Sequence, residues 1–146
     1  MKDHGTALRT GYVEAFVDNL DLNGIKVPIV DGMVSQLPAI GIFGVFGSQQ
    51  DTDKSNKDKW VFETSLDFAI VDKRKVSAGK KDVESIGDQV LQIVFPTIKT
   101  YGIIIAAPFN ITFIKYLSGV AEDVMLDSMN HPVMIKRFQF INRITQ

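Results

Sequence analysis

The chain has 146 residues and a mass of 16.2 kDa, a length typical of one domain, and we expect residues 1–146 to fold as a single unit. Lys and Arg number 16 and Asp and Glu number 17, which gives a formal charge of −1. A dedicated nucleic-acid binder normally has a clear basic excess, so the charge argues against that class of protein. No cysteine is present, which excludes disulfides and thiolate sites, and a hydrophobic share of 45% excludes a disordered chain.

Neither end of the sequence nor its interior carries a membrane signal. The longest apolar stretch is Tyr101–Phe109, which is too short to cross a bilayer. The first residues lack the apolar region of a secretion signal. We therefore expect no membrane association.

The first part of the chain predicts a helix followed by short strands. Apolar residues recur every three or four positions over Ala7–Leu20, the spacing of a helix with one buried side, and Thr6 is the expected N-cap. Alternation over Ile25–Ile29 predicts a short strand that Pro28 places at a sheet edge. Pro38–Phe46 predicts another strand, with apolar residues on both faces.

A polar segment and a long strand come next. Residues 49–59 contain no apolar side chain, so we expect a mobile polar hairpin loop there. Over Trp60–Asp72 the apolar residues Trp60, Phe62, Leu66, Phe68 and Ile70 share one face and the polar residues Glu63, Ser65 and Asp67 share the other, as in a strand with one buried face. We expect it to pair antiparallel with Pro38–Phe46 across the polar loop.

The second half predicts one helix and several strands. Helical spacing runs over Gly79–Phe95. Alternation then predicts strands over Tyr101–Ala107, Asn110–Leu117 and Val133–Ile144, the last of them at an edge of the sheet. The segment Ser118–Pro132 fits either a short helix or a strand.

These elements predict a two-layer α+β fold. A mainly antiparallel sheet of four to six strands would carry two amphipathic helices on one face. The expected core consists of the apolar side chains on the inward faces: Leu8, Tyr12, Phe16, Ile42, Phe62, Leu66, Phe68, Ile86, Val90, Val94 and Phe113.

No set of catalytic or metal-binding residues has the required spacing. His4 and His131 lie far apart in the sequence and outside any metal-ligand cluster, so we expect no metal and no cofactor. Asp127, Ser128 and His131 have the residue types of a hydrolytic triad but lack a nucleophile elbow, and a turn is the better interpretation. We expect a protein that is not an enzyme, with a hydrolase at these three residues as an alternative to be tested.

Two polar segments are candidate interaction surfaces. The first joins the polar loop to the outward face of the long strand: Asp51, Asp53, Lys54, Lys57, Lys59, Glu63, Ser65 and Asp67. The second is a basic run before the second helix: Lys73, Arg74, Lys75, Lys80 and Lys81. The basic run would line a DNA channel or contact an acidic partner, and an ordinary solvated loop is the alternative.

The order of the segments is itself informative. A first helix is followed by Val27-Pro28-Ile29, by the strand Leu37–Ile42, by the long strand Trp60–Asp67 after a polar loop, and by a second helix that ends in Val90–Val94. Over nearly the whole chain this arrangement resembles the tail-terminator (tail-completion) and neck-ring proteins of tailed bacteriophages. Members of that family are small α+β domains that assemble as rings between the capsid portal and the tail, and they offer no catalytic residues to carry over.

The resemblance implies a non-enzymatic virion component, assembled in the cytoplasm of a bacterial host. It would form a homo-oligomeric ring, a hexamer or dodecamer, at the head–tail junction. There it would end tail polymerisation or adapt the portal to the tail, with portal, adaptor or tail proteins as partners, and would let DNA pass without binding it specifically.

A second class of function stays open. A small-ligand-binding or regulatory α+β domain would hold an apolar pocket between its helices and its sheet. A deep apolar pocket with convergent polar groups would favour that class, whereas a flat sheet with protruding loops would favour an assembly protein.

Overall fold

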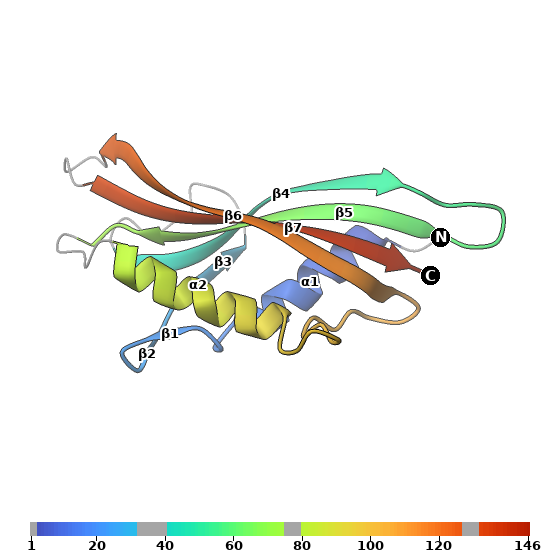
Figure 1. Cartoon of the computed structure of the whole chain (residues 1–146), viewed down its shortest axis with the longest axis horizontal. Helices are drawn as coiled ribbons and strands as arrows, with labels where there is room; N and C mark the ends of the chain where they lie inside the picture. Colours follow the sequence, from blue (N-terminus) through green and yellow to red (C-terminus); the bar gives the residue numbers. More distant parts are fainter. Residues whose placement is uncertain (1–2, 32–40, 75–79, 127–131) are drawn as a thin grey trace.

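Two helices lie on one face of a five-stranded sheet (Figure 1). The computed structural model describes residues 3–31, 41–74, 80–126 and 132–146, with side chains described outside 120–126 and 132. The elements are α1 (His4–Phe16), β1 (Asp21–Leu22), β2 (Ile25–Lys26), β3 (Ile29–Asp31), β4 (Ile42–Asp53), β5 (Val61–Asp72), α2 (Lys80–Val94), β6 (Asn110–Leu126) and β7 (Pro132–Thr145).

The strand order in the sheet is β3-β4-β5-β7-β6, and β1 and β2 form a separate two-stranded sheet. Only the β3–β4 pair is parallel among the described pairs, so the predicted two-layer, mainly antiparallel α+β fold is confirmed. The expectation that the last strand lies at an edge is wrong. β6 pairs antiparallel with β7 and takes the outer position, which leaves β7 between β5 and β6.

Both helices occur where the sequence pattern predicts them, with different ends. Asp3, not Thr6, caps α1, because its carboxylate accepts hydrogen bonds from the backbone N–H groups of Gly5 (2.9 Å) and Thr6 (3.2 Å). The helix stops at Phe16 rather than Leu20, since Asp18 takes a left-handed backbone conformation (φ 62°). The buried side of α2 contains the predicted core residues Ile86, Val90 and Val94, together with Val83, whereas Leu91 is only half-buried.

β4 and β5 form the predicted antiparallel hairpin, but β4 is longer than expected. Residues 49–53 are strand rather than loop, since they continue the ladder with β5 from Gln49 opposite Leu66 to Asp53 opposite Phe62. Backbone pairing requires no apolar side chain, so composition alone placed the loop too early. The predicted strand start at Pro38 lies outside the described residues.

The segment that links α2 to β6 is not the strand predicted over Tyr101–Ala107. Its backbone bonds to the end of α2 instead, where the Gly102 N–H donates to the Val94 carbonyl at 3.0 Å. Two of its apolar side chains, Ile103 and Phe109, are buried, whereas Ile98 and Ile104 are exposed. β6 then runs unbroken to Leu126, so the ambiguous segment after Leu117 is strand up to that residue.

The space between helices and sheet is a packed apolar core. The predicted core is confirmed for the buried residues Leu8, Tyr12, Phe16, Phe62, Leu66, Phe68, Ile86, Val90 and Val94. Ile42 is only half-buried at its margin.

Phe113 is the error in the predicted core, since half of its surface (51%) is exposed. Ile111 lies opposite the buried Ile144, whereas Phe113 lies opposite the exposed Arg143, because the register of β6 shifts between these two positions. A bulge of this kind reverses which residues face inward. Phe113 therefore lies on the sheet face away from the helices, called here the open face, and Ile114 takes the buried position.

Candidate interaction surfaces

The end of the β4–β5 hairpin, residues 54–60, is called here the lysine tip. It is a closed turn: the Lys54 N–H donates to the Val61 carbonyl at 2.8 Å, and the Asn56 side-chain oxygen accepts from the N–H groups of Asp58 (2.9 Å) and Lys59 (3.1 Å). Three exposed lysines and one half-exposed indole occupy it: Lys54, Lys57, Lys59 and Trp60.

The first predicted surface divides between two faces of the sheet. The register shift between Phe46 and Gln49 puts Asp51 opposite Thr64 and Asp53 opposite Phe62, on the side of the helices. There the Asp51 carboxylate lies 3.6 Å from the His4 ring nitrogen, and hydrogen bonds from Ser55 lower the pKa of Asp53.

The outward residues of β5 lie on the other side, as the strand's alternation predicts. Glu63, Ser65 and Asp67 are on the open face, with Glu63 directly opposite Arg143 of β7. The structure therefore separates these three residues from Asp51 and Asp53, with the lysine tip at the end between the two faces.

The basic run is only partly available to a partner. Arg74 is held by two carboxylates, since its guanidinium donates to both oxygens of the buried Asp72 (2.9 and 2.8 Å) and to Asp82 at 2.5 Å. Hydrogen bonds to Asp72 and Asp82 raise the pKa of Arg74. Lys73 lies over the ring of Phe43 at 5.8 Å.

The rest of the basic run is at the start of α2. Lys80 and Lys81 are exposed there. Lys75 lies outside the described residues. Among the described residues of this run, Arg74 is therefore engaged by carboxylates, whereas Lys80 and Lys81 are exposed to a partner.

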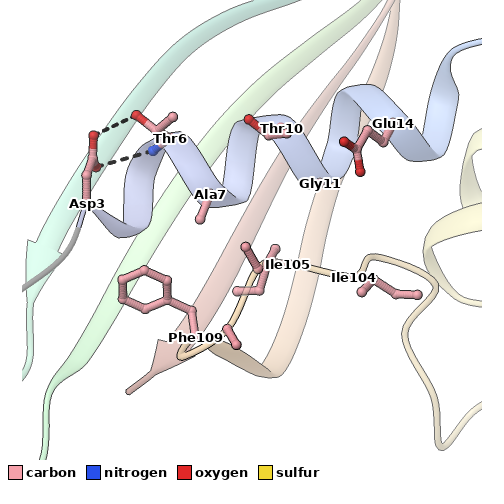
Figure 2. A pocket seen from close by; sticks show the side chains of 11 residues that line it. Asp3, Thr6, Ala7, Thr10, Gly11, Glu14, Ile104, Ile105 and Phe109 are labelled. Carbon is pink, nitrogen blue, oxygen red and sulfur yellow. Dashed lines mark hydrogen bonds between the residues drawn. The ribbon is translucent and has the colours of Figure 1, made fainter.

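A groove that the sequence did not predict runs between α1 and the segment before β6, and is called here the α1 groove (Figure 2). It has a volume of about 720 Å³. Its lining residues are Asp3, Thr6, Ala7, Thr10, Gly11, Glu14, Ile104, Ile105, Ala106, Ala107 and Phe109.

Small residues on α1 allow the opposite wall to come close. A methyl group on Gly11 would lie 2.7 Å from the Ile104 carbonyl oxygen, so only glycine fits at this point of the helix. Ile104 itself turns outward and is 83% exposed. The signal available in the sequence was the pair Ala7 and Gly11, one helical turn apart on one side of α1.

The rim of the α1 groove is anionic. Asp3 accepts a hydrogen bond from the Thr6 hydroxyl at 2.6 Å, and this bond lowers the pKa of the Asp3 carboxyl and keeps it charged. Glu14 is exposed near the other end of α1 from Asp3 (Figure 2). The polar groups at Asp3 and Thr6 bond to each other rather than converging on the groove, which fits a surface for a chain better than a pocket for a small molecule.

The open face is apolar on its outer strand. Phe113 and Leu117 of β6 are 51% and 64% exposed, with the exposed Lys115 between them. β6 pairs with β7 on one side, and no other described strand pairs with its outer edge. The strand predicted over Ile25–Ile29 is divided: Ile25–Lys26 is β2, which pairs with β1, and the sheet edge is β3 (Ile29–Asp31), which pairs only with β4 in the described part of the chain.

The histidines and carboxylates were the candidate metal-binding and catalytic residues. No group of three or more His, Asp or Glu side chains among the described residues is arranged to hold a metal ion. His4 stacks on Phe62 with ring centroids 3.9 Å apart, as a packed aromatic residue does. Asp127, Ser128 and His131 lie outside the described residues.

Comparisons with known proteins place the fold. No protein-family model matches the chain, and no curated protein sequence does. Among solved structures, a chain from the virion of a native gene transfer agent particle matches with a TM-score of 0.64 and 10% sequence identity, over 98% of this chain and 95% of that chain. The two chains share one fold along nearly their whole lengths. In the described part of this chain, no helix is long and apolar enough to cross a membrane.

Proposed function

We propose that this protein is a structural component of a phage-like virion and acts by self-association rather than by catalysis. The observation that carries the proposal is the likeness to a chain of a gene transfer agent virion, which extends over 98% of this chain and 95% of the other.

The surfaces described above support an assembly role. β6 is a strand of 17 residues whose outer edge pairs with no other described strand, and an edge of that length with exposed Phe113 and Leu117 is a template for another chain. Two further surfaces differ from each other in shape and charge: the lysine tip is a turn with three exposed lysines, and the α1 groove is concave with an anionic rim. Unlike surfaces on one chain suit the head-to-tail contacts that close a ring.

Within the virion we propose a homo-oligomeric ring, a hexamer or dodecamer, at the head–tail junction. It would end the tail or adapt the portal to it, with portal, adaptor or tail proteins as neighbours. A formal charge of −1 suits a conduit that passes DNA without holding it. Lys80 and Lys81 are the residues proposed to face that channel or an acidic partner, since Arg74 is engaged by Asp72 and Asp82.

The test combines assembly state with location. Sedimentation velocity and negative-stain imaging of the purified protein should reveal a ring whose population rises with protein concentration. Antibody labelling of particles from a producing host should place the protein at the junction of head and tail. A protein that stays monomeric at high concentration, with and without candidate neck proteins, and is absent from purified particles would refute the proposal.

A further inference from the structure

We infer that the lysine tip of one copy docks into the α1 groove of the next copy, with Trp60 as the apolar anchor. The inference rests on the proposed self-association and names the two surfaces that meet in it. It commits to a second copy of this chain as the occupant of the groove.

The α1 groove sets the chemistry of its occupant. Its floor and far wall are apolar, formed by Ala7 and by the segment 104–107 with Phe109. Its rim carries the carboxylates of Asp3 and Glu14, and among the described residues that line it there is no Lys or Arg. An occupant should therefore bring one large apolar group flanked by positive charges.

The lysine tip has that composition. Trp60, the single tryptophan of the chain, is 43% exposed and stands beside Lys59, with Lys54 and Lys57 in the same turn. One acid, Asp58, accompanies these three lysines. An exposed indole flanked by cations complements an apolar groove flanked by carboxylates.

The tip is also ordered before it binds. Besides the bonds of Asn56, the Ser55 hydroxyl accepts from the Val61 N–H at 3.0 Å, and the Ser55 N–H donates to the Asp53 carboxylate at 2.8 Å. A preformed turn loses less conformational entropy on docking than a flexible loop would.

The two surfaces are distinct parts of one chain. The groove's lining residues come from α1 and the segment 104–109, and none comes from residues 54–60. A contact between unlike surfaces is heterologous, and repetition of it around an axis closes a ring. The pairing thus supplies the kind of interface that the proposed function requires.

The experiment uses the tryptophan as its own reporter. Sedimentation velocity measures assembly, while intrinsic fluorescence and acrylamide quenching measure the exposure of Trp60 in the same samples. Assembly should shift the emission to shorter wavelength and reduce quenching several-fold, because the indole leaves water. Trp60→Ala should weaken self-association at least about tenfold, as removal of an interface anchor does.

Charge reversal makes the test specific to these surfaces. Glu14→Lys and Lys57→Glu should each weaken assembly several-fold, and the double variant should recover most of the loss, because the pair is again of opposite sign. Lys26→Glu is the matched control: it reverses an exposed lysine of β2, which belongs neither to the tip nor to the lining of the groove, and should leave assembly unchanged. Circular dichroism verifies that each variant is folded, and the reversals keep the test informative if Trp60→Ala does not fold.

The outcomes separate the inference from the proposed function. Rings that form while Trp60 stays open to quencher, or that Lys57→Glu leaves intact, overturn the docking of the tip and leave the proposed function standing. The docking is also overturned if the unmodified protein binds duplex DNA and Lys57→Glu loses that binding while it assembles normally. The lysine tip would then be a DNA contact rather than a subunit contact. Absence of any assembly in the unmodified protein overturns both.

Discussion

The Tyr12 hydroxyl donates a hydrogen bond of 2.6 Å to the side-chain oxygen of Asn142, and both side chains are fully buried. The bond joins α1 to β7 across 130 positions of sequence. The Asn142 amide in turn donates to the carbonyl oxygens of Thr64 (3.1 Å) and Phe140 (3.3 Å). A polar network inside an apolar core fixes where α1 rests on the sheet, because any other position would leave these groups without partners.

Removing the Tyr12 hydroxyl should destabilise the fold. In Tyr12→Phe the Asn142 oxygen loses its donor in a fully buried site, at a cost of about 1–3 kcal/mol in the free energy of unfolding. Urea denaturation followed by circular dichroism measures it. Tyr116→Phe is the control, since Tyr116 is 41% exposed and should change stability by less than about 0.5 kcal/mol. Equal effects of the two substitutions would contradict the role of the buried bond.

The same phenol should make the protein sensitive to alkali. Burial raises the pKa of Tyr12 far above its ordinary range, so the folded protein keeps the proton that the unfolded chain releases above about pH 10. The folded state then binds more protons, and stability falls as pH rises. Denaturation midpoints measured from pH 8 to 11 should therefore fall faster for the unmodified protein than for Tyr12→Phe. Parallel curves would show that Tyr12 ionises freely in the folded state.

Arg74 should act as a stabilising residue. Asp72 is fully buried, so Arg74→Ala leaves its carboxylate without its strongest partner and should lower the free energy of unfolding by about 3 kcal/mol. The stability of Arg74→Lys should lie between that of the unmodified protein and that of Arg74→Ala, because lysine keeps the positive charge but cannot form the two parallel hydrogen bonds. Lys80→Ala removes an exposed charge nearby and serves as the control. A stable Arg74→Ala protein with impaired assembly would instead assign Arg74 to an interface.

The bulge in β6 predicts unequal costs for two phenylalanines. Phe140→Ala opens a cavity in the core and should cost about 3–5 kcal/mol, since Phe140 is fully buried. Phe113→Ala should cost less than about 1 kcal/mol, because half of that side chain already lies in water on the open face. Thermal denaturation of both variants gives the comparison. A large loss in the Phe113 variant would mean that residue 113 faces the core and that the bulge is absent.

Sequence pattern predicted the elements and most of the core because it depends on near neighbours. Period-two spacing of apolar residues over Trp60–Asp72 identified β5 and its inward face, and helical spacing identified the buried side of α2. These periodicities state which residues share a face before any tertiary contact is known. The prediction was wrong for residues 49–53, which are polar and were expected to form a loop. They are strand in β4 because their backbone groups pair with β5.

The candidate surfaces depended more on long-range pairing. The sequence indicated the lysines of the tip and the outward residues of β5, but it grouped Asp51 and Asp53 with them. One extra residue in β4 and one in β6 reversed the faces of Asp51 and Phe113, and a shift of this kind leaves no local signal. The α1 groove was not predictable, because its two walls come from segments about 95 positions apart that meet only when the chain is folded.

The sequence by itself determined an α+β domain with two one-sided helices, a long alternating strand and a lysine-rich turn, since each of these follows from the order of apolar and polar residues along a short stretch. The tertiary structure decided that β6 lies outside β7, that Arg74 is bound to Asp72 and Asp82, and that α1 carries a groove with an anionic rim. Those features arise from contacts between residues distant in the chain, where backbone hydrogen bonding and close packing, rather than local composition, set the lowest free energy.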